Sequence, residues 1–164
     1  MVPPDLQPEV LGDHLDRLYR AAWAMCGSRE DAEDLVQETY MRVLSKRREI
    51  ATDEDAVPYL LAVLRNTFVS SLRTKGRRPV QASLEDAEGR LAAPASASPV
   101  ERLAAREVYA AISALPDDQR DVVAAVDVAG LSYGEAAEAL GVPTGTVMSR
   151  LYRGRDRVAA AVTA

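Results

Sequence analysis

The chain has 164 residues, a formal net charge of −5 and an apolar fraction of 48%. This length suits one ordinary domain or two small ones. One cysteine and one histidine exclude an intramolecular disulfide and a zinc site built from several such residues. Because there is neither a run of 18 apolar residues nor a signal-peptide pattern, we expect no membrane insertion and a cytoplasmic location.

Charge is distributed unevenly along the sequence. Residues 1–64 and 79–141 carry net charges of −6 and −7, whereas residues 65–78 and 142–164 carry +5 and +3. Two basic segments in an acidic body are typical of a protein that binds a phosphate backbone locally. Cations at helix C-termini produce the same pattern, so charge alone leaves both interpretations open.

Abundant alanine and helical periodicity predict three helices in the first half of the chain. The first spans residues 10–27. The second spans residues 29–48 and follows Ser28, which precedes Asp31 by three residues as an N-cap residue does. The third spans about residues 55–75, with Pro58 tolerated in its first turn. The residues expected to face the core are Leu11, Leu15, Leu18 and Ala22, then Ala32, Leu35, Thr39 and Val43, and finally Val57, Leu61, Leu64, Phe68 and Leu72.

The second and third helices also carry distinctive polar faces. On the second, a mainly acidic stripe with one apolar residue can dock on a basic protein helix. On the third, an aromatic ring, an amide, a hydroxyl and a cation can stack on bases and bind a phosphate backbone. An ordinary solvated surface has the same spacing in both cases. The stripes consist of Asp34, Gln37, Glu38 and Met41 on the second helix, and of Tyr59, Asn66, Ser70 and Arg73 on the third.

Residues 79–99 differ in composition from the rest of the chain. Proline, alanine, serine and glycine dominate this segment, which predicts a flexible linker. It would span about 70 Å fully extended and roughly 25 Å as a relaxed coil. We therefore predict an all-α protein with two small helical domains, residues 1–78 and 100–164, that can bind separated parts of one DNA.

The second domain is expected to end in a helix-turn-helix, after helices over residues 100–115 and 117–130. Ser132 and Glu135 match a capping box, Gly141 suits a turn with positive φ, and Pro143 can open the next helix. That helix would bury its apolar side and direct polar residues outward near its start, where a recognition helix meets base edges. A plain helical hairpin with a soluble outer face shares these signals. The apolar side comprises Val147, Leu151 and Val158, and the outward side Ser149, Tyr152 and Arg153, flanked by Arg150, Arg155 and Arg157.

Three segments together resemble a known family. They are DAEDLVQETYMRVL, YLLAVLRNTFVSSLRTKGRRP and, after the linker, LSYGEAAEALGVPTGTVMSRLYRGR. In this order they resemble bacterial RNA polymerase sigma factors of the sigma-70 family, and most closely the two-domain extracytoplasmic-function (ECF) type. The resemblance covers about residues 10–78, the sigma-2 domain, and 100–160, the sigma-4 domain.

The resemblance implies a function without catalysis, cofactor or metal. The chain would bind core RNA polymerase, through the β′ clamp helices and the β flap, and direct it to the −10 and −35 elements of promoter DNA. An anti-sigma factor would be a further partner. An attached enzymatic function is not expected, because the sequence has no glycine-rich phosphate loop or nucleophile motif. His14 and Cys26 are expected to be surface or packing residues, with a redox role for Cys26 left open.

The resemblance also implies roles for individual residues. Polymerase docking falls on Asp34, Gln37, Glu38 and Met41. Contacts with the −10 element fall on Tyr59, Arg65, Asn66, Ser70, Arg73, Lys75, Arg77 and Arg78, and capture of a flipped −10 base falls on about residues 46–57. Contacts with the −35 element fall on Thr146, Met148, Ser149, Arg150, Tyr152, Arg153, Arg155 and Arg157.

Three positions depart from the family pattern. Met148 stands where lysine or arginine is usual, and Tyr59 where tryptophan is common. Gly154 replaces the usual alanine and is expected to loosen the recognition helix by up to about 1 kcal/mol.

Two other functions are compatible with parts of the sequence. A dimeric helix-turn-helix repressor that acts without polymerase shares the C-terminal motif, but it does not need the acidic stripe or the linker. A sigma factor that only titrates an anti-sigma protein does not need arginines in both basic segments.

Overall fold

The computed structural model describes residues 14–45, 56–75 and 98–164, and in these ranges every regular element is a helix. The predicted all-α class is therefore confirmed. The helices are α2 (Leu15–Cys26), α3 (Arg29–Ser45), α4 (Ala56–Lys75), α5 (Pro99–Ser113), α6 (Asp117–Val123), the π-helix η3 (Ala124–Val128), α7 (Tyr133–Leu140) and α8 (Thr144–Val162). The predicted base-capture loop up to residue 55 and most of the predicted linker lie outside the described residues.

Helices α2, α3 and α4 pack together in the N-terminal half, residues 14–75. Gly27 ends α2 with a φ of 72°, a left-handed conformation that glycine adopts at little cost. The Ser28 hydroxyl then accepts a hydrogen bond from the Asp31 amide, as the N-cap pattern predicted. The predicted inner stripes of α3 and α4 are buried, except that Leu72 is only half-buried, whereas Leu15 at the start of α2 is exposed.

Helices α5 to α8 form the C-terminal half, residues 98–164. A capping box between Ser98 and Glu101 opens α5, with Pro99 as its first residue. The helix therefore begins within the predicted linker, one residue before the expected start. Helix α6 continues without a break into η3, and α8 packs against α5, α6 and α7.

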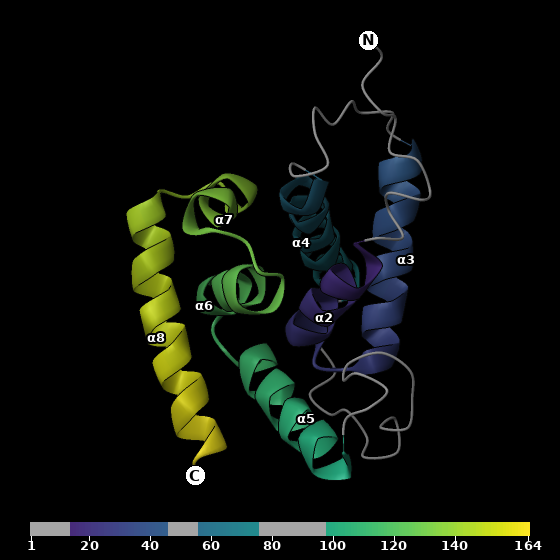
Figure 1. The fold of residues 1–164 in the computed structure, drawn as a ribbon. Helices are drawn as coiled ribbons and strands as arrows, with labels where there is room; N and C mark the ends of the chain where they lie inside the picture. Colours follow the sequence, from purple (N-terminus) through teal and green to yellow (C-terminus); the bar gives the residue numbers. More distant parts are fainter. Residues whose placement is uncertain (1–13, 46–55, 76–97) are drawn as a thin grey trace.

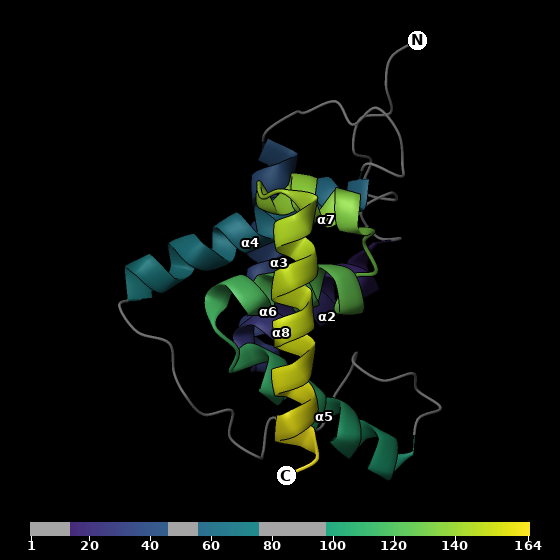
Figure 2. The same ribbon diagram turned by 90° about the vertical axis from the view of Figure 1, so that its left-hand side faces the viewer.

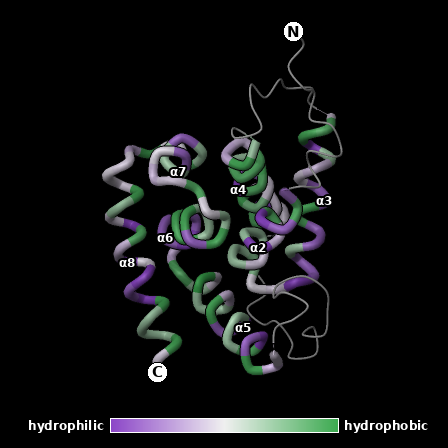
Figure 3. The backbone as a smooth tube through the Cα atoms, viewed as in Figure 1, coloured by the Kyte–Doolittle hydropathy of each residue, from purple (hydrophilic) through white to green (hydrophobic). Residues whose placement is uncertain are grey.

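The two halves lie directly against each other (Figure 1). Helix α2 contacts α5 and η3, and α4 contacts α7, so one continuous core runs through both halves. In Figure 1 α3 and α8 lie on opposite sides of the molecule, and Figure 2 shows α8 running along the outside of the other helices. Hydrophilic and hydrophobic residues alternate along these two outer helices (Figure 3), which leaves each with one solvent-facing side. Every described helix is too short or too polar to cross a bilayer.

Candidate nucleic-acid and protein interfaces

The direction of α8 is set by the end of the preceding helix. Ser132 and Glu135 form reciprocal capping hydrogen bonds at the start of α7, and Gly141 ends that helix with a φ of 68°. Pro143 then precedes α8 in an extended conformation. The capping box and the turn glycine predicted for the helix-turn-helix are both confirmed.

Helix α8 is anchored along one side and open along the other. Val147 and Leu151 are buried against the rest of the half, whereas the Tyr152 side chain on the opposite side is 76% exposed. The predicted division of the helix into an apolar and an outward face is therefore confirmed. Of the predicted −35 residues, Thr146 and Arg150 are half-buried, and the exposed ones are Met148, Ser149, Tyr152, Arg153, Arg155 and Arg157.

The arginines of α8 differ in what they contact. Arg155 donates from Nε and Nη2 to the two carboxylate oxygens of Asp127, at 2.9 and 2.6 Å. This hydrogen bonding to Asp127 raises the pKa of the Arg155 guanidinium. Arg150 lies 3.5 Å from an oxygen of Asp118. Arg155 and Arg150 thus tie α8 to η3 and α6, whereas the exposed guanidinium of Arg153 bonds only to the Ser149 carbonyl of its own helix among the described contacts.

Gly154 lies where α8 crosses α6. The residue is buried, and a Cβ atom there would come within 2.7 Å of a methyl group of Val123 and 3.5 Å of the Gln119 backbone oxygen. The sequence comparison with the family predicted only a loss of helix propensity at this position. In the structure the missing side chain instead allows the two helices to approach closely.

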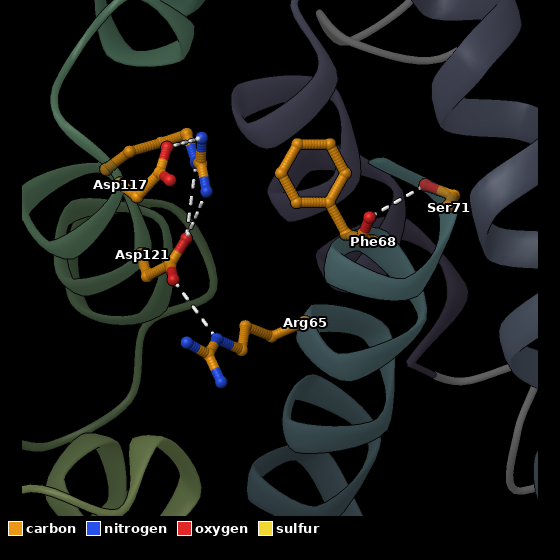
Figure 4. A network of polar contacts seen from close by, with 6 residues as sticks. Arg65, Phe68, Ser71, Asp117 and Asp121 are labelled. Atoms are coloured by element: carbon orange, nitrogen blue, oxygen red, sulfur yellow. Dashed lines mark hydrogen bonds and ion pairs between the residues drawn. The ribbon is translucent and has the colours of Figure 1, made fainter. Parts of the chain in front are cut away.

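Helix α4 presents a mixed polar face. Asn66 and Arg73 are exposed, and Tyr59 and Ser70 are half-buried. Arg65 differs from these, because its Nε donates to a carboxylate oxygen of Asp121 in α6 at 3.2 Å (Figure 4). Lys75 is the last residue of the helix. Arg77 and Arg78, the remaining predicted −10 residues, lie outside the described residues.

The acidic stripe of α3 faces away from the core. Asp34, Gln37 and Glu38 are exposed, and the Met41 side chain is 72% exposed. Glu38 accepts an ion-pair hydrogen bond from Arg42 at 2.7 Å on the same helix. Leu44, three residues beyond Met41, is also exposed. Helical spacing places it beside Met41, so this second apolar residue of the stripe was open to prediction and was missed.

Titratable residues do not gather into a metal site in the part of the chain that the structure describes. Cys26 packs against the core as a half-buried residue, and His14 directly precedes α2.

Comparison with known proteins gives matches to both halves. The family model for sigma-70 region 2 matches residues 10–78, and the model for sigma-70 region 4 matches residues 105–158. The ECF RNA polymerase sigma factor SigM of Bacillus subtilis is 31% identical over 154 residues, which cover 93% of this chain and 92% of SigM.

Other relatives differ in length. SigE of Mycolicibacterium smegmatis is 36% identical over 155 residues, but this chain covers only 59% of that protein, against 92% of its own length. EcfG of Rhodopseudomonas palustris is 36% identical over 141 residues, with 85% of this chain and 75% of EcfG covered.

Solved structures share the fold. The sigma factor RpoE of Bartonella quintana, in complex with the anti-sigma factor NepR, superimposes with a TM-score of 0.72 at 28% identity, and the match covers 94% of this chain and 95% of RpoE. CnrH, in complex with the cytosolic domain of CnrY, has a TM-score of 0.68 at 21% identity. The helical fold, the helix-turn-helix and the relatives agree: the chain belongs to the sigma-70 family, among the ECF sigma factors, which direct RNA polymerase to promoters in transcription initiation.

Proposed function

We propose that the chain binds core RNA polymerase and brings it to promoters by reading the −10 element with the N-terminal half and the −35 element with the C-terminal half. The observation that carries this proposal is the geometry of α8. Its start projects from a capped turn, its apolar side is anchored by Val147 and Leu151, and Ser149, Tyr152 and Arg153 face solvent. A recognition helix needs these properties to enter a major groove.

Docking on polymerase is assigned to α3. Asp34, Gln37 and Glu38 supply negative charge and hydrogen-bond acceptors, while Met41 and Leu44 supply apolar area beside them. A charged rim around apolar anchors is the usual composition of a protein interface. The basic partner surface is that of the β′ clamp helices, and the β flap would receive the C-terminal half.

The −10 element is assigned to the face of α4. Asn66 and Arg73 are exposed there, and the basic tail that follows adds charge for the phosphate backbone. Polymerase supplies the chemistry of RNA synthesis, so this chain needs no catalytic group of its own. We place its action in the cytoplasm and expect an anti-sigma factor to control it, since RpoE of Bartonella quintana, which shares this fold, forms a complex with the anti-sigma factor NepR.

Run-off transcription tests the proposal. Purified chain is added to purified core RNA polymerase on restriction fragments of genomic DNA from the source organism. We expect transcripts with defined start sites that are absent with core enzyme alone. If the chain neither associates with core enzyme nor produces new start sites, the proposed function is wrong.

A further inference from the structure

The outward side of α8 carries two large apolar side chains beside its polar ones. Met148 is 53% exposed and Tyr152 is 76% exposed. Both lie in the first half of the helix, near the end that follows the capped turn. They are four residues apart, so only about 40° around the helix axis separates them and their side chains are neighbours on the helix surface. Met148 and Tyr152 therefore form one apolar patch in the part of α8 that is assigned to DNA.

Polar and cationic groups border the apolar patch. On one side lie Ser149, whose hydroxyl donates to a carbonyl of its own helix at 3.1 Å, and the exposed Arg153. On the other side lies Arg155, which Asp127 holds in a bidentate ion pair. Residues 142–164 carry a net charge of +3. Because its surroundings are cationic, the patch suits contact with an anionic partner such as a duplex better than with an apolar protein surface.

There is room beside the Met148 side chain, toward the start of the helix. Side chains in a helix lean toward its N-terminus, so Met148 covers the turn that contains Gly145. Gly145 is exposed, and a Cβ atom there would have no neighbour within 4 Å. The missing side chain at Gly145 thus allows a small group of the partner to lie against the thioether of Met148.

The major groove of a duplex offers one projecting apolar group, the C5-methyl group of thymine. The other groups on the base edges there are hydrogen-bond donors and acceptors. Covering one of these with an apolar side chain would leave it without a partner, which costs free energy. The thioether of methionine has no hydrogen to donate to a phosphate either. Contact with a methyl group instead removes apolar area on both molecules from water.

We propose that Met148 is a specificity-determining residue, which selects a thymine in the −35 element by packing on its C5-methyl group, with the ring of Tyr152 beside it. The proposal rests on the proposed function, because it requires α8 in the major groove of a promoter. Arg153, on the far side of Ser149, remains free to contact hydrogen-bonding groups of the same element. Apolar and polar contacts of one helix then specify different bases.

Replacement of thymine by uracil tests this contact, because it removes the methyl group and leaves base pairing and the hydrogen-bonding groups unchanged. A promoter found by run-off transcription is prepared as a set of duplexes. In each of them one thymine of the −35 element, on either strand, is replaced by uracil. Binding of the reconstituted holoenzyme to each duplex is compared with binding to the unmodified promoter. At one position we expect a loss of about fourfold, the effect of a single buried methyl group.

Variants of the chain assign this loss to one side chain. With Met148→Ala the same uracil substitution should have almost no effect. With Met148→Leu, which keeps an apolar side chain of similar volume and helix propensity, the loss should remain. The matched control is Val162→Ala, which removes an exposed apolar side chain from the last turn of α8 and should keep the full uracil effect. Arg153→Ala should weaken binding to both duplexes alike.

Melting temperatures of the free chains check that the variants fold. Met148 is exposed, and substitutions at exposed positions usually change the free energy of unfolding little. We therefore expect Met148→Ala and Met148→Leu to melt close to the parent chain, and pull-down of core enzyme to be unchanged. If Met148→Ala instead lowers the recovery of core enzyme and uracil has no effect, the apolar patch contacts polymerase and the proposal is wrong.

The two proposals fail in different ways. Suppose that the holoenzyme starts transcription at defined sites, but the −35 element has no thymine at which uracil weakens binding, or the uracil effect persists in Met148→Ala. The methyl contact is then wrong and the proposed function stands. If the chain produces no defined start sites with core enzyme, the proposed function and the contact that depends on it are both wrong.

Discussion

At the scale of single residues, the arginines of α8 divide into two groups that sequence alone does not separate. Arg155 and Arg150 form ion pairs with Asp127 and Asp118, so part of their charge holds the helix in place. Arg153 contacts only its own helix among the described residues and remains exposed. Because a guanidinium that is not held in an ion pair can form bidentate contacts with a guanine edge, Arg153 is the residue expected to read sequence.

Arg153→Ala should therefore weaken recognition of the −35 element and leave polymerase binding unchanged. A lost base contact costs about 1–3 kcal/mol, or roughly five- to 150-fold in affinity. The measurement is binding of reconstituted holoenzyme to promoter duplexes with an intact or a scrambled −35 element, together with pull-down of core enzyme. Arg106→Ala on α5 serves as the control. Equal losses on the intact and the scrambled duplex would show that Arg153 contacts only phosphates.

Asp34 is the corresponding test residue for the α3 stripe. Asp34→Ala should reduce the amount of core polymerase recovered in a pull-down, because an exposed carboxylate is lost from the proposed interface. Free-chain stability should hardly change, since exposed surface positions usually contribute within about 0.5 kcal/mol. Glu33→Ala removes the same charge from the neighbouring position, where the carboxylate pairs with Arg29. If both variants lose polymerase equally, net charge and not the stripe controls docking.

At the scale of helices, Gly154 lies where α6 and α8 cross, and replacing it would have two opposite effects on the free energy of unfolding. Replacing glycine by alanine within a helix gains about 1 kcal/mol of propensity, whereas forcing an extra methyl group into a packed contact costs about 1–3 kcal/mol. We expect the clash with Val123 to decide, since the nearest atoms belong to a β-branched side chain and to the α6 backbone. Gly154→Ala should therefore lower the melting temperature by several degrees.

Gly145→Ala is the matched control for this substitution. Gly145 lies in the same helix, is exposed, and a Cβ atom there would have no neighbour within 4 Å. This variant should raise the melting temperature, since only the propensity gain remains. If calorimetry gives a higher melting temperature for both variants, α6 shifts to accommodate the added methyl group and Gly154 is not required for packing.

Local signals predicted most of the helices and their inward faces. These signals depend only on residues within one or two helical turns of each other. They are glycine at a left-handed turn, as at Gly141, serine with glutamate three residues later, as at Ser132, and apolar residues at helical spacing, as in α4. The role of Gly154 was not predictable in this way, because it depends on which helix crosses α8. The η3 π-helix and the involvement of Arg155 with Asp127, 28 positions apart, likewise depend on tertiary contacts.

At the scale of the whole molecule, the sequence pointed to two tethered units and the structure shows them in contact. Composition over residues 79–99 indicates a connection that permits separation, but it carries no information on whether the units attract each other. That attraction comes from pairs such as Arg17 with Ala129, 112 positions apart. In the sequence Arg17 is one of two arginines on an amphipathic helix, and nothing marks it as different from Arg20.

The contact between α2 and α5 has a practical consequence. Trp23, the single tryptophan of the chain, stacks on Tyr109 across the boundary between the halves, with ring centres 4.7 Å apart. Indole emission responds to the polarity of its surroundings, and parting of the rings would bring water to this one indole ring. Trp23 emission of the isolated chain therefore reports, without any dye, whether α2 and α5 remain in contact.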